Sequence, residues 1–321
     1  MESHAKRSAN WSVRLPATAL LLAVVFAVSS CGSNKPAATP IVQTTFNTPE
    51  EAGHALEAAA KSGDQNSLAQ ILGPDSIAIV SSGIPEQDKA ALDSHTAEFE
   101  KMNRWVTMTD GSQVLYIGAD NYPFPIPLTK DASSKWHFDT AAGQREVLAR
   151  RIGKNEILAI DAVSAIANAE ELYSKTSHDA NPAHLYTPLL ISTAGKQDGL
   201  YWPVPASEPS SPLGRLDEFA GDAISSAAQG GPPVFDGYNL RVLTGQGPAA
   251  KGGAKSYIAN GKMTGGFAVL AYPLKYEDTG IMTFILSREG IVYENDLGAK
   301  TADVAAAIKD YNPTDDWTPV E

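Results

Sequence analysis

The residues in this sequence that could take part in chemistry are a glycine-rich run, a few histidines and one cluster of charged side chains. The glycine-rich run, residues 244–253 (TGQGPAAKGG), has the composition of a phosphate-binding loop. In such a loop a serine or threonine follows the lysine at the start of a helix. Here Gly252 follows Lys251, Pro248 interrupts the run, and another strand is predicted next. We therefore interpret the run as a tight loop between strands, in which the glycines permit the turns.

Histidines and carboxylates are the next candidates. His178 and His184 are close in sequence, with Asp179 between them, and are expected to be exposed loop residues. Metal sites usually need three or four ligands, and the chain has neither an HExxH motif nor a Cys/His spacing. It also lacks the Gly-x-Ser-x-Gly turn of serine hydrolases. We interpret the carboxylate pairs Glu170-Glu171 and Asp315-Asp316 as solvated surface groups. These patterns predict no catalytic residue, no metal ion and no cofactor.

The cluster of charged side chains lies near the start of the longest predicted helix. Its members are Arg150, Arg151, Lys154, Asn155 and Glu156. Residues four apart share a helix face, so Arg150 lies beside Lys154. A second polar set, in a loop after the helix, is Lys196, Asp198 and Trp202. Either both sets line a groove at a domain junction that binds a peptide or glycan, or they form an ion-pair network between two domains. We favour the network, with Trp202 covering the helix.

The first half of the chain is predicted to contain helices followed by strands. Thr48 has the position of an N-cap, Pro49 is the first helical residue, and Glu51 completes a capping box. This helix should end at Gly63, and Asp64 should cap a short second helix. The other predicted elements are a helix at 89–102 and strands at 105–108, 114–117, 126–129 and 136–138, with a tight turn at 110–111.

The second half is predicted to begin with one long helix, residues 144–175, whose apolar residues recur at steps of three, four and seven. A Gly-, Pro- and Ser-rich stretch follows at 181–233. Long loops without regular structure are uncommon, so we predict a helix at 216–228 within it. The remaining predicted elements are strands at 238–244, 256–259, 267–272, 282–287 and 291–294, and a closing helix at 301–311.

These elements predict an α+β protein with two domains. The layout of residues 47–140 resembles the cystatin-like fold of nuclear-transport-factor-like domains. The layout of residues 141–321, a long helix before an antiparallel meander, resembles a pilin-like headgroup. Unlike a pilin, the chain has no apolar stem next to that helix, so the resemblance implies a pilin-like head used outside a filament.

The N-terminus has the pattern of a lipoprotein signal peptide. Three basic residues, Lys6, Arg7 and Arg14, precede an apolar run at 15–28 that is shorter than a membrane span. Small residues then lead into Cys31, the only cysteine of the chain. We expect residues 1–30 to be removed and Cys31 to carry fatty acyl chains such as palmitate. Residues 31–46, small and polar with two prolines, are predicted to be a flexible tether.

The anchor and the net charge together predict the location. No aspartate follows Cys31 to retain the protein in an inner membrane, so we expect lipid anchoring at the outer membrane, facing the periplasm. The net charge of −12 becomes more negative once the basic signal peptide is removed. A negative surface repels nucleic acid. The expected partners are the membrane, through the anchor, and an envelope protein or glycan, with no nucleic acid.

Several longer segments carry a family resemblance. They are 138–143 (FDTAAG), 149–156 (ARRIGKNE), 195–203 (GKQDGLYWP), 211–214 (SPLG), 244–250 (TGQGPAA) and 260–267 (NGKMTGGF). Together they resemble the uncharacterised bacterial lipoprotein family known as domain of unknown function 2950, from about Thr48 to the C-terminus. The resemblance implies an exported bacterial protein and supplies no catalytic residues.

Three functions are compatible with these patterns. The leading hypothesis is a non-enzymatic binding or scaffolding lipoprotein of the cell envelope. The first alternative is a periplasmic enzyme, or an enzyme accessory, that acts on peptidoglycan or a small molecule at the domain-junction cleft. The second alternative is an accessory of a pilus or secretion system, which the pilin-like layout alone suggests.

Overall fold

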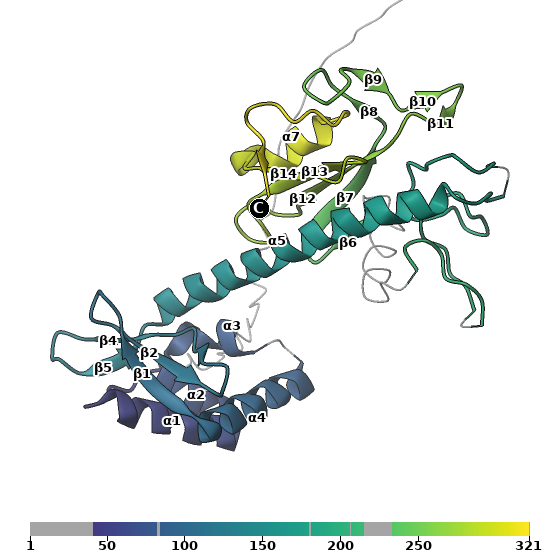
Figure 1. Cartoon of the computed structure of the whole chain (residues 1–321). Coiled ribbons are helices and arrows are strands. Elements are labelled where there is room, and N and C mark those ends of the chain that lie inside the picture. The colour runs from purple at the N-terminus through teal and green to yellow at the C-terminus, as the bar shows by residue number, and fades with distance from the viewer. Residues whose placement is uncertain (1–40, 82–83, 180, 206, 215–232, 321) are drawn as a thin grey trace, which may run out of the picture. The chain divides into compact units, whose positions relative to one another are not determined.

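The structure of the chain is a computed structural model that describes residues 41–81, 84–179, 181–205, 207–214 and 233–320 (Figure 1). The predicted signal peptide, Cys31, most of the tether and the predicted helix at 216–228 lie outside these residues. Residues 41–321 form one compact unit by their contacts. This unit combines helices with antiparallel sheets, so the predicted α+β class is confirmed.

The first two helices begin and end where the sequence places their caps. Helix α1, Pro49–Ser62, follows Thr48, whose hydroxyl accepts a hydrogen bond from the Glu51 amide at 3.2 Å. In a capping box the Glu51 carboxylate would accept from the amide of the N-cap, Thr48. Here it accepts from the amide of the preceding residue, Asn47, at 2.8 Å. Helix α2, Gln65–Leu72, is capped by the side chain of Asp64.

A five-stranded sheet completes the first half. After α2 come η1 (Pro74–Ser76), α3 (Ile77–Val80) and α4 (Pro85–Lys101), then β1 (Asn103–Thr107), β2 (Gln113–Ile117), β3 (Tyr122–Pro123), β4 (Leu128–Lys130) and β5 (Trp136–Phe138). The sheet order is β1-β2-β4-β5, with β3 also paired to β2. Helix α4 begins before the predicted residue 89 because Pro85 occupies its first turn, where proline is favoured.

Helix α5, Thr140–Tyr173, contacts elements of both halves. Asp139 caps it by accepting from the Ala142 amide at 2.9 Å, so it begins earlier than the predicted residue 144. At its start, the hydroxyl of Thr140 donates to the carbonyl of Leu72. Further along, α5 packs on strands of the second sheet. None of the described helices is long and apolar enough to cross a membrane.

The second half contains a six-stranded antiparallel sheet. Its order is β15 (Thr318–Pro319), β14 (Val292–Asn295), β13 (Thr283–Ser287), β12 (Ala268–Pro273), β7 (Tyr238–Leu243) and β6 (Val234–Phe235). Every residue of β12 and β13 is buried, because α5 covers one face and α7 (Thr301–Ala307) the other (Figure 1). Arg241 of β7 donates to the carbonyls of Ala305, Ala306 and Ile308 at the end of α7.

Two short strand pairs lie beside this sheet. Strand β8 (Gly245–Gln246) pairs with β9 (Lys255–Ser256), and β10 (Ile258–Ala259) pairs with β11 (Lys262–Met263). The single strand predicted at 256–259 is therefore wrong, since the chain changes partner at Tyr257. The glycine-rich run contains β8, and its remaining residues turn toward β9 through backbone bonds from Ala250 to Gly247 and from Gly253 to Ala250, so the prediction of a tight loop between strands is confirmed.

Two glycines of α5 allow a matched test of how the helix packs. A Cβ at Gly143 would lie 2.6 Å from Cγ1 of Ile126, which is fully buried, whereas a Cβ at Gly153 would meet no atom within 4 Å. We expect Gly143→Ala to lower the free energy of unfolding in spite of alanine's better helix propensity. Gly153→Ala should raise it by about 0.5–1 kcal/mol. Urea unfolding of both variants measures this, and a stabilised Gly143→Ala would contradict the packing described.

Candidate functional site

Both arginines of the predicted cluster bond to neighbouring elements of the fold. Arg150 donates through Nε to Glu146 at 2.8 Å and through Nη1 to the hydroxyl of Tyr122 at 2.9 Å. Its guanidinium also lies 5.2 Å from the centre of the Tyr122 ring. Arg151 donates to the carboxylate of Asp278 and, at 3.2 Å, to the Asp278 carbonyl. These contacts join α5 to β3 and to the loop before β13.

Asn155 and Glu156 attach the next turn of α5 to the same loop. Asn155 donates to the carbonyl of Thr279 at 2.9 Å. One oxygen of Glu156 accepts from the amides of Ile281 and Met282 at 2.9 and 3.0 Å. Lys154 is exposed. The polar atoms of four of the five cluster members therefore bond to neighbouring groups and hold the helix in place. This agrees with the favoured interpretation as a structural network.

The structure does not bring the second predicted set to this cluster. Trp202 lies beside His178, just beyond Tyr173, the last residue of α5. At about 1.5 Å per residue, the helix rises roughly 25 Å between Glu156 and Tyr173. Lys196 and Asp198 lie in a turn, where Asp198 accepts from the amide of Thr193 at 2.7 Å and the Lys196 amide bonds to the Thr193 carbonyl.

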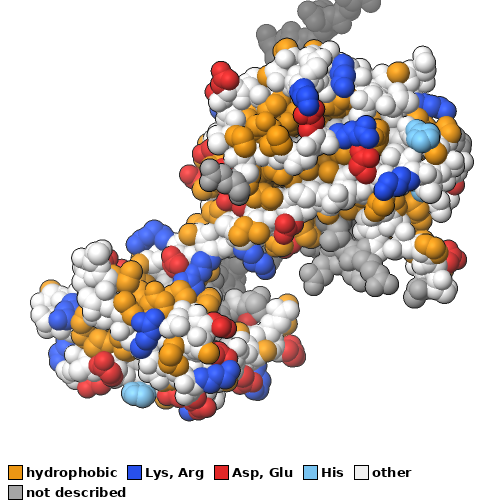
Figure 2. All heavy atoms as spheres, in the orientation of Figure 1, with side chains coloured by type: hydrophobic (Ala, Val, Ile, Leu, Met, Phe, Trp, Pro, Cys, Tyr) orange, Lys and Arg blue, Asp and Glu red, His pale blue; other side chains and the backbone are white. Residues whose placement is uncertain are grey.

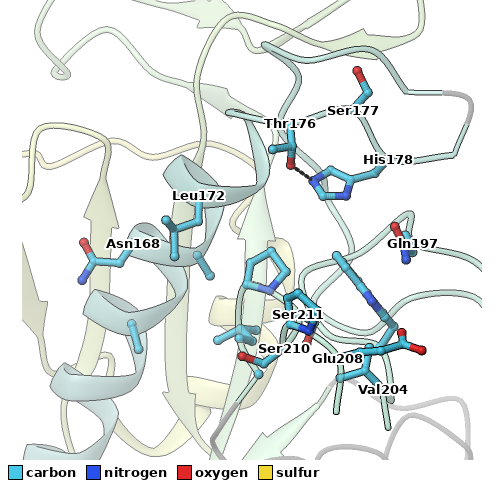
Figure 3. Close-up of a pocket in the computed structure, with 17 residues that line it drawn as sticks. Asn168, Leu172, Thr176, Ser177, His178, Gln197, Val204, Glu208, Ser210 and Ser211 are labelled. Carbon is cyan, nitrogen blue, oxygen red and sulfur yellow. Dashed lines mark hydrogen bonds between the residues drawn. The ribbon is translucent and has the colours of Figure 1, made fainter. Parts of the chain in front are cut away.

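A cavity of about 920 Å³ opens where Trp202 lies. Its wall combines three segments: the last turns of α5, the turn that follows the helix, and the loop after Trp202 (Figure 3). Figure 3 shows Asn168 and Leu172 on the helix, and Glu208, Ser210 and Ser211 on the loop after Trp202. The polar residues of the wall are Asn168, Thr176, Ser177, His178, Gln197, Glu208, Ser210 and Ser211.

Aromatic rings form one side of the cavity. His178 stacks on Tyr173, with ring centres 4.2 Å apart, and its ring lies 5.4 Å from that of Trp202. Nε2 of His178 lies 2.9 Å from the hydroxyl of Thr176 and 3.1 Å from the carbonyl of Tyr173. His178 is buried, so the prediction of an exposed loop residue is wrong for it, whereas His184 is exposed.

Ser211 is a buried polar residue of the cavity wall whose hydroxyl has no hydrogen-bond partner among the described residues. A buried polar group without a partner costs free energy. A serine nucleophile needs a base within hydrogen-bonding reach, and Nε2 of His178 contacts Thr176 and Tyr173 instead. The described residues therefore place no base beside the Ser211 hydroxyl that could activate it as a nucleophile.

The loop that carries Trp202 is held to α5 through a buried carboxyl. Oε2 of Glu170 accepts from the amide of Thr187 at 3.1 Å, and the hydroxyl of Thr187 donates to the Asp198 carbonyl at 2.5 Å. The chain then returns beside itself, with a bridge between Ile191 and Tyr201. Gly199 permits this close approach, since a Cβ there would lie 2.7–2.9 Å from backbone atoms of residues 189–192.

The prediction that Glu170 and Glu171 are both solvated is wrong for Glu170. Its side chain is fully buried, and Oε1 has no hydrogen-bond partner among the described residues. Burial raises the pKa of Glu170 to about 8, against the opposing effect of the Thr187 amide, and the charge of Glu171 adds to the increase. Glu171 is half-buried and pairs with Arg288 at 2.6 Å. Adjacent helix positions face different surroundings, so one carboxyl is buried and the other is not.

Among the described residues, no three His, Cys, Asp or Glu side chains are placed to hold a metal ion. Sequence patterns single out His178 and Trp202 for other reasons. They give no reason to select Thr176, Glu208 or Ser211, which line the same cavity. Of these three, only Ser211 lies in a segment that carries the family resemblance, 211–214. Residues that meet only through a loop have no regular spacing in the sequence that could reveal them.

A family model described as protein of unknown function (DUF2950) matches residues 43–320. The chain belongs to this family. Comparison with curated proteins found no match, and comparison with solved structures found none either. The match covers all three wall segments of the cavity, so the cavity belongs to the family's own region of the chain. The finer resemblances to a cystatin-like and a pilin-like fold stay predictions.

Glu170 makes the stability of this family member depend on pH. Its folded pKa of about 8 lies above its ordinary value of 4.5, so between these values the folded state holds a proton that the unfolded chain has lost. The free energy of unfolding should therefore fall as pH rises through this window. Glu170→Gln, which cannot titrate, should gain stability relative to wild type between pH 5 and pH 8.5, by more than about 1 kcal/mol.

Urea unfolding at several pH values measures this difference. Glu171→Gln is the control, because it removes the neighbouring carboxyl that is not fully buried. It should keep most of the wild-type dependence on pH, since burial is the largest cause of the raised pKa of Glu170 and the charge of Glu171 is the smallest. A constant difference between Glu170→Gln and wild type across the range would show that Glu170 is not protonated in the folded protein.

Proposed function

We propose that this protein is a lipid-anchored, non-enzymatic binding protein of the bacterial cell envelope, and that the cavity beside Trp202 binds its ligand. The N-terminal pattern supports an anchor on Cys31 and a tether at 31–46. Two or more acyl chains hold a protein to a membrane durably, whereas one chain binds marginally. We place the protein at the outer membrane, facing the periplasm, where its ligand is an envelope component.

The observation that carries the binding role is the cavity of about 920 Å³, whose wall includes the rings of Trp202 and His178. Ligand sites combine apolar and aromatic surface with a few placed polar groups. Glu208 is the only Asp, Glu, Lys or Arg among the described lining residues. The described wall offers no lysine or arginine to pair with an anion, which favours a neutral or cationic ligand.

A neutral glycan fits this wall best. One face of a sugar ring is formed by C–H groups, which can pack on the indole of Trp202. Its hydroxyl and amide groups can bond to the side chains of Asn168, Gln197 and Ser210. On the face shown in Figure 2, basic and acidic side chains are interspersed, with no basic patch that would attract a polyanion. We therefore propose the glycan strands of peptidoglycan as the ligand.

The enzyme alternative has less support. Three of the residues that would serve a domain-junction cleft, Arg150, Arg151 and Glu156, have their polar groups engaged by neighbouring elements. In the cavity, the Ser211 hydroxyl has no base beside it. No contact of the described residues favours a pilus or secretion role.

The anchor is tested by Cys31→Ser in the full chain. Wild type should be labelled by radioactive palmitate and should sediment with membranes, because the thiol carries the acyl chains. Cys31→Ser should lose both the label and the sedimentation. Ser33→Ala is the matched control and should keep both. Membrane sedimentation of Cys31→Ser equal to that of wild type would contradict lipid anchoring through this residue.

The ligand is tested by titrating a tetramer of N-acetylglucosamine into the chain Ile41–Glu321 and following binding by calorimetry. Wild type should bind saturably, and Trp202→Ala should weaken binding at least tenfold, since a central tryptophan commonly contributes about 2 kcal/mol. Trp317→Ala is the control, because Trp317 is a half-buried tryptophan that lines a different pocket.

Two results would contradict the glycan assignment. One is the absence of saturable binding to wild type at millimolar tetramer. The other is an equal loss of affinity in Trp202→Ala and Trp317→Ala.

A further inference from the structure

The loop segments in the wall of the cavity beside Trp202 bond to one another. We call residues 187–202 the Trp202 loop. Within it the amide of Leu200 donates to the carbonyl of Leu189 at 3.0 Å. Farther along the wall, the amide of Leu213 donates to the carbonyl of Leu200, also at 3.0 Å. These bonds fix the parts of the wall to each other and not to α5, so the place of Trp202 beside the helix depends on the contacts between the loop and α5.

Two side chains near the end of α5 bond to this loop. Oε2 of Glu170 accepts from the amide of Thr187 at 3.1 Å, and the hydroxyl of Thr187 donates to the Asp198 carbonyl at 2.5 Å. The hydroxyl of Tyr173 donates to the Gln197 carbonyl at 3.0 Å. Through Thr187, Glu170 is therefore connected both to the start of the loop and to the residues just before its tryptophan.

The carboxyl of Glu170 has no cationic partner. The titratable groups that face it are the carboxyl of Glu171 and the phenols of Tyr173 and Tyr186, and none of them is positively charged. Arg288 pairs with Glu171 at 2.6 Å and lies over the ring of Tyr186. Oε1 of Glu170 is buried without a hydrogen-bond partner among the described residues. An ionised Glu170 would be a buried charge without a counter-ion, which is costly.

The neutral form of Glu170 is the form that fits the closed loop. Burial raises its pKa to about 8, whereas the same carboxyl in water has its ordinary pKa of 4.5. Between these two values, each rise of one pH unit shifts the equilibrium about tenfold toward a state in which water reaches the carboxyl. Helix α5 is stiff because its turns are closed by hydrogen bonds. The loop is the part that can move to admit water, because loops open at a lower free energy than core elements do.

We propose that Glu170 is a positioning residue of the glycan site: its protonated carboxyl holds the Trp202 loop against α5, and its ionisation releases the loop and weakens ligand binding. This inference rests on the function proposed for the cavity and adds a control of the same site by pH. The site is complete in neutral or mildly acidic surroundings and opens in alkaline ones.

Hydrogen exchange measures the release of the loop without a ligand. The Thr187 amide is buried and bonded to Glu170, so it should exchange only when the loop opens. Wild type and Glu170→Gln are compared in the chain Ile41–Glu321 at the same pH, so that the intrinsic exchange rate cancels. Between pH 6 and pH 8.5 the exchange rate of wild type should rise about tenfold or more relative to Glu170→Gln, which cannot ionise.

Strand β12 is the internal reference for this measurement. Its residues are all buried in the second sheet, so its amides should exchange only when the whole fold unfolds. They should exchange more slowly than the Thr187 amide at both pH values. This difference separates a local release of the loop from the change in global stability that Glu170 also causes.

Calorimetric titration with the tetramer of N-acetylglucosamine connects the loop to the cavity. The tetramer has no group that titrates between pH 6 and pH 8.5. Relative to Glu170→Gln at the same pH, wild type should lose roughly fivefold or more in affinity over this range, because only the closed loop binds. The comparison also removes any contribution of His178, another titratable group of the wall. Glu171→Gln is the matched control and should keep most of the wild-type loss.

Three results would overturn the proposal. The first is a ratio of exchange rates between wild type and Glu170→Gln that is the same at pH 6 and pH 8.5. The second is exchange of the Thr187 amide no faster than that of β12. The third is saturable binding whose affinity changes equally with pH in wild type and Glu170→Gln. Absence of tetramer binding at pH 6 would instead contradict the function proposed for the cavity, and the exchange data alone would then show whether Glu170 holds the loop.

Discussion

The packing of α5 is the constraint on which the rest of the structure depends. Its first turns lie against the core of the first half, where Gly143 contacts Ile126 and Thr140 bonds to Leu72. Its later turns lie on the second sheet. An α-helix is stiff because every turn is closed by hydrogen bonds. The position of a residue along α5 therefore decides which core, loop or cavity its side chain can reach.

This constraint explains the different roles of polar residues on one helix. Arg150, Arg151 and Glu156 lie where α5 meets β3 and the loop before β13, and their polar atoms are used in those contacts. Glu170 lies where the helix meets the Trp202 loop, and it bonds to Thr187 there. The fold thereby accepts the cost of a buried carboxyl near the wall of its largest described cavity. Proteins commonly carry their binding residues on loops held by a rigid element.

Much of the fold could be predicted because its signals are local. Thr48, Asp64 and Pro49 mark helix ends through bonds to residues within one turn. The strands β7, β12 and β13 are visible as apolar runs bounded by turn residues. The predictions failed where a distant segment of the chain decides how a residue pairs or whether it is buried. Strands β9 and β10 are adjacent in sequence but pair with different segments. Glu170 is buried, although the adjacent Glu171 is only half-buried.

The sequence by itself determined the α+β class, the helix caps and the family, because these depend on residues that are near each other in the chain or on long shared segments. Only the tertiary structure decided which polar residues meet. It separated Trp202 from the arginine cluster and joined it to His178 and Ser211, because loops after α5 return to the helix end rather than to its start. It also left Nε2 of His95 and the hydroxyl of Ser211 buried, with no hydrogen-bond partner among the described residues. Burial depends on contacts between distant segments, and no spacing along a single chain encodes them.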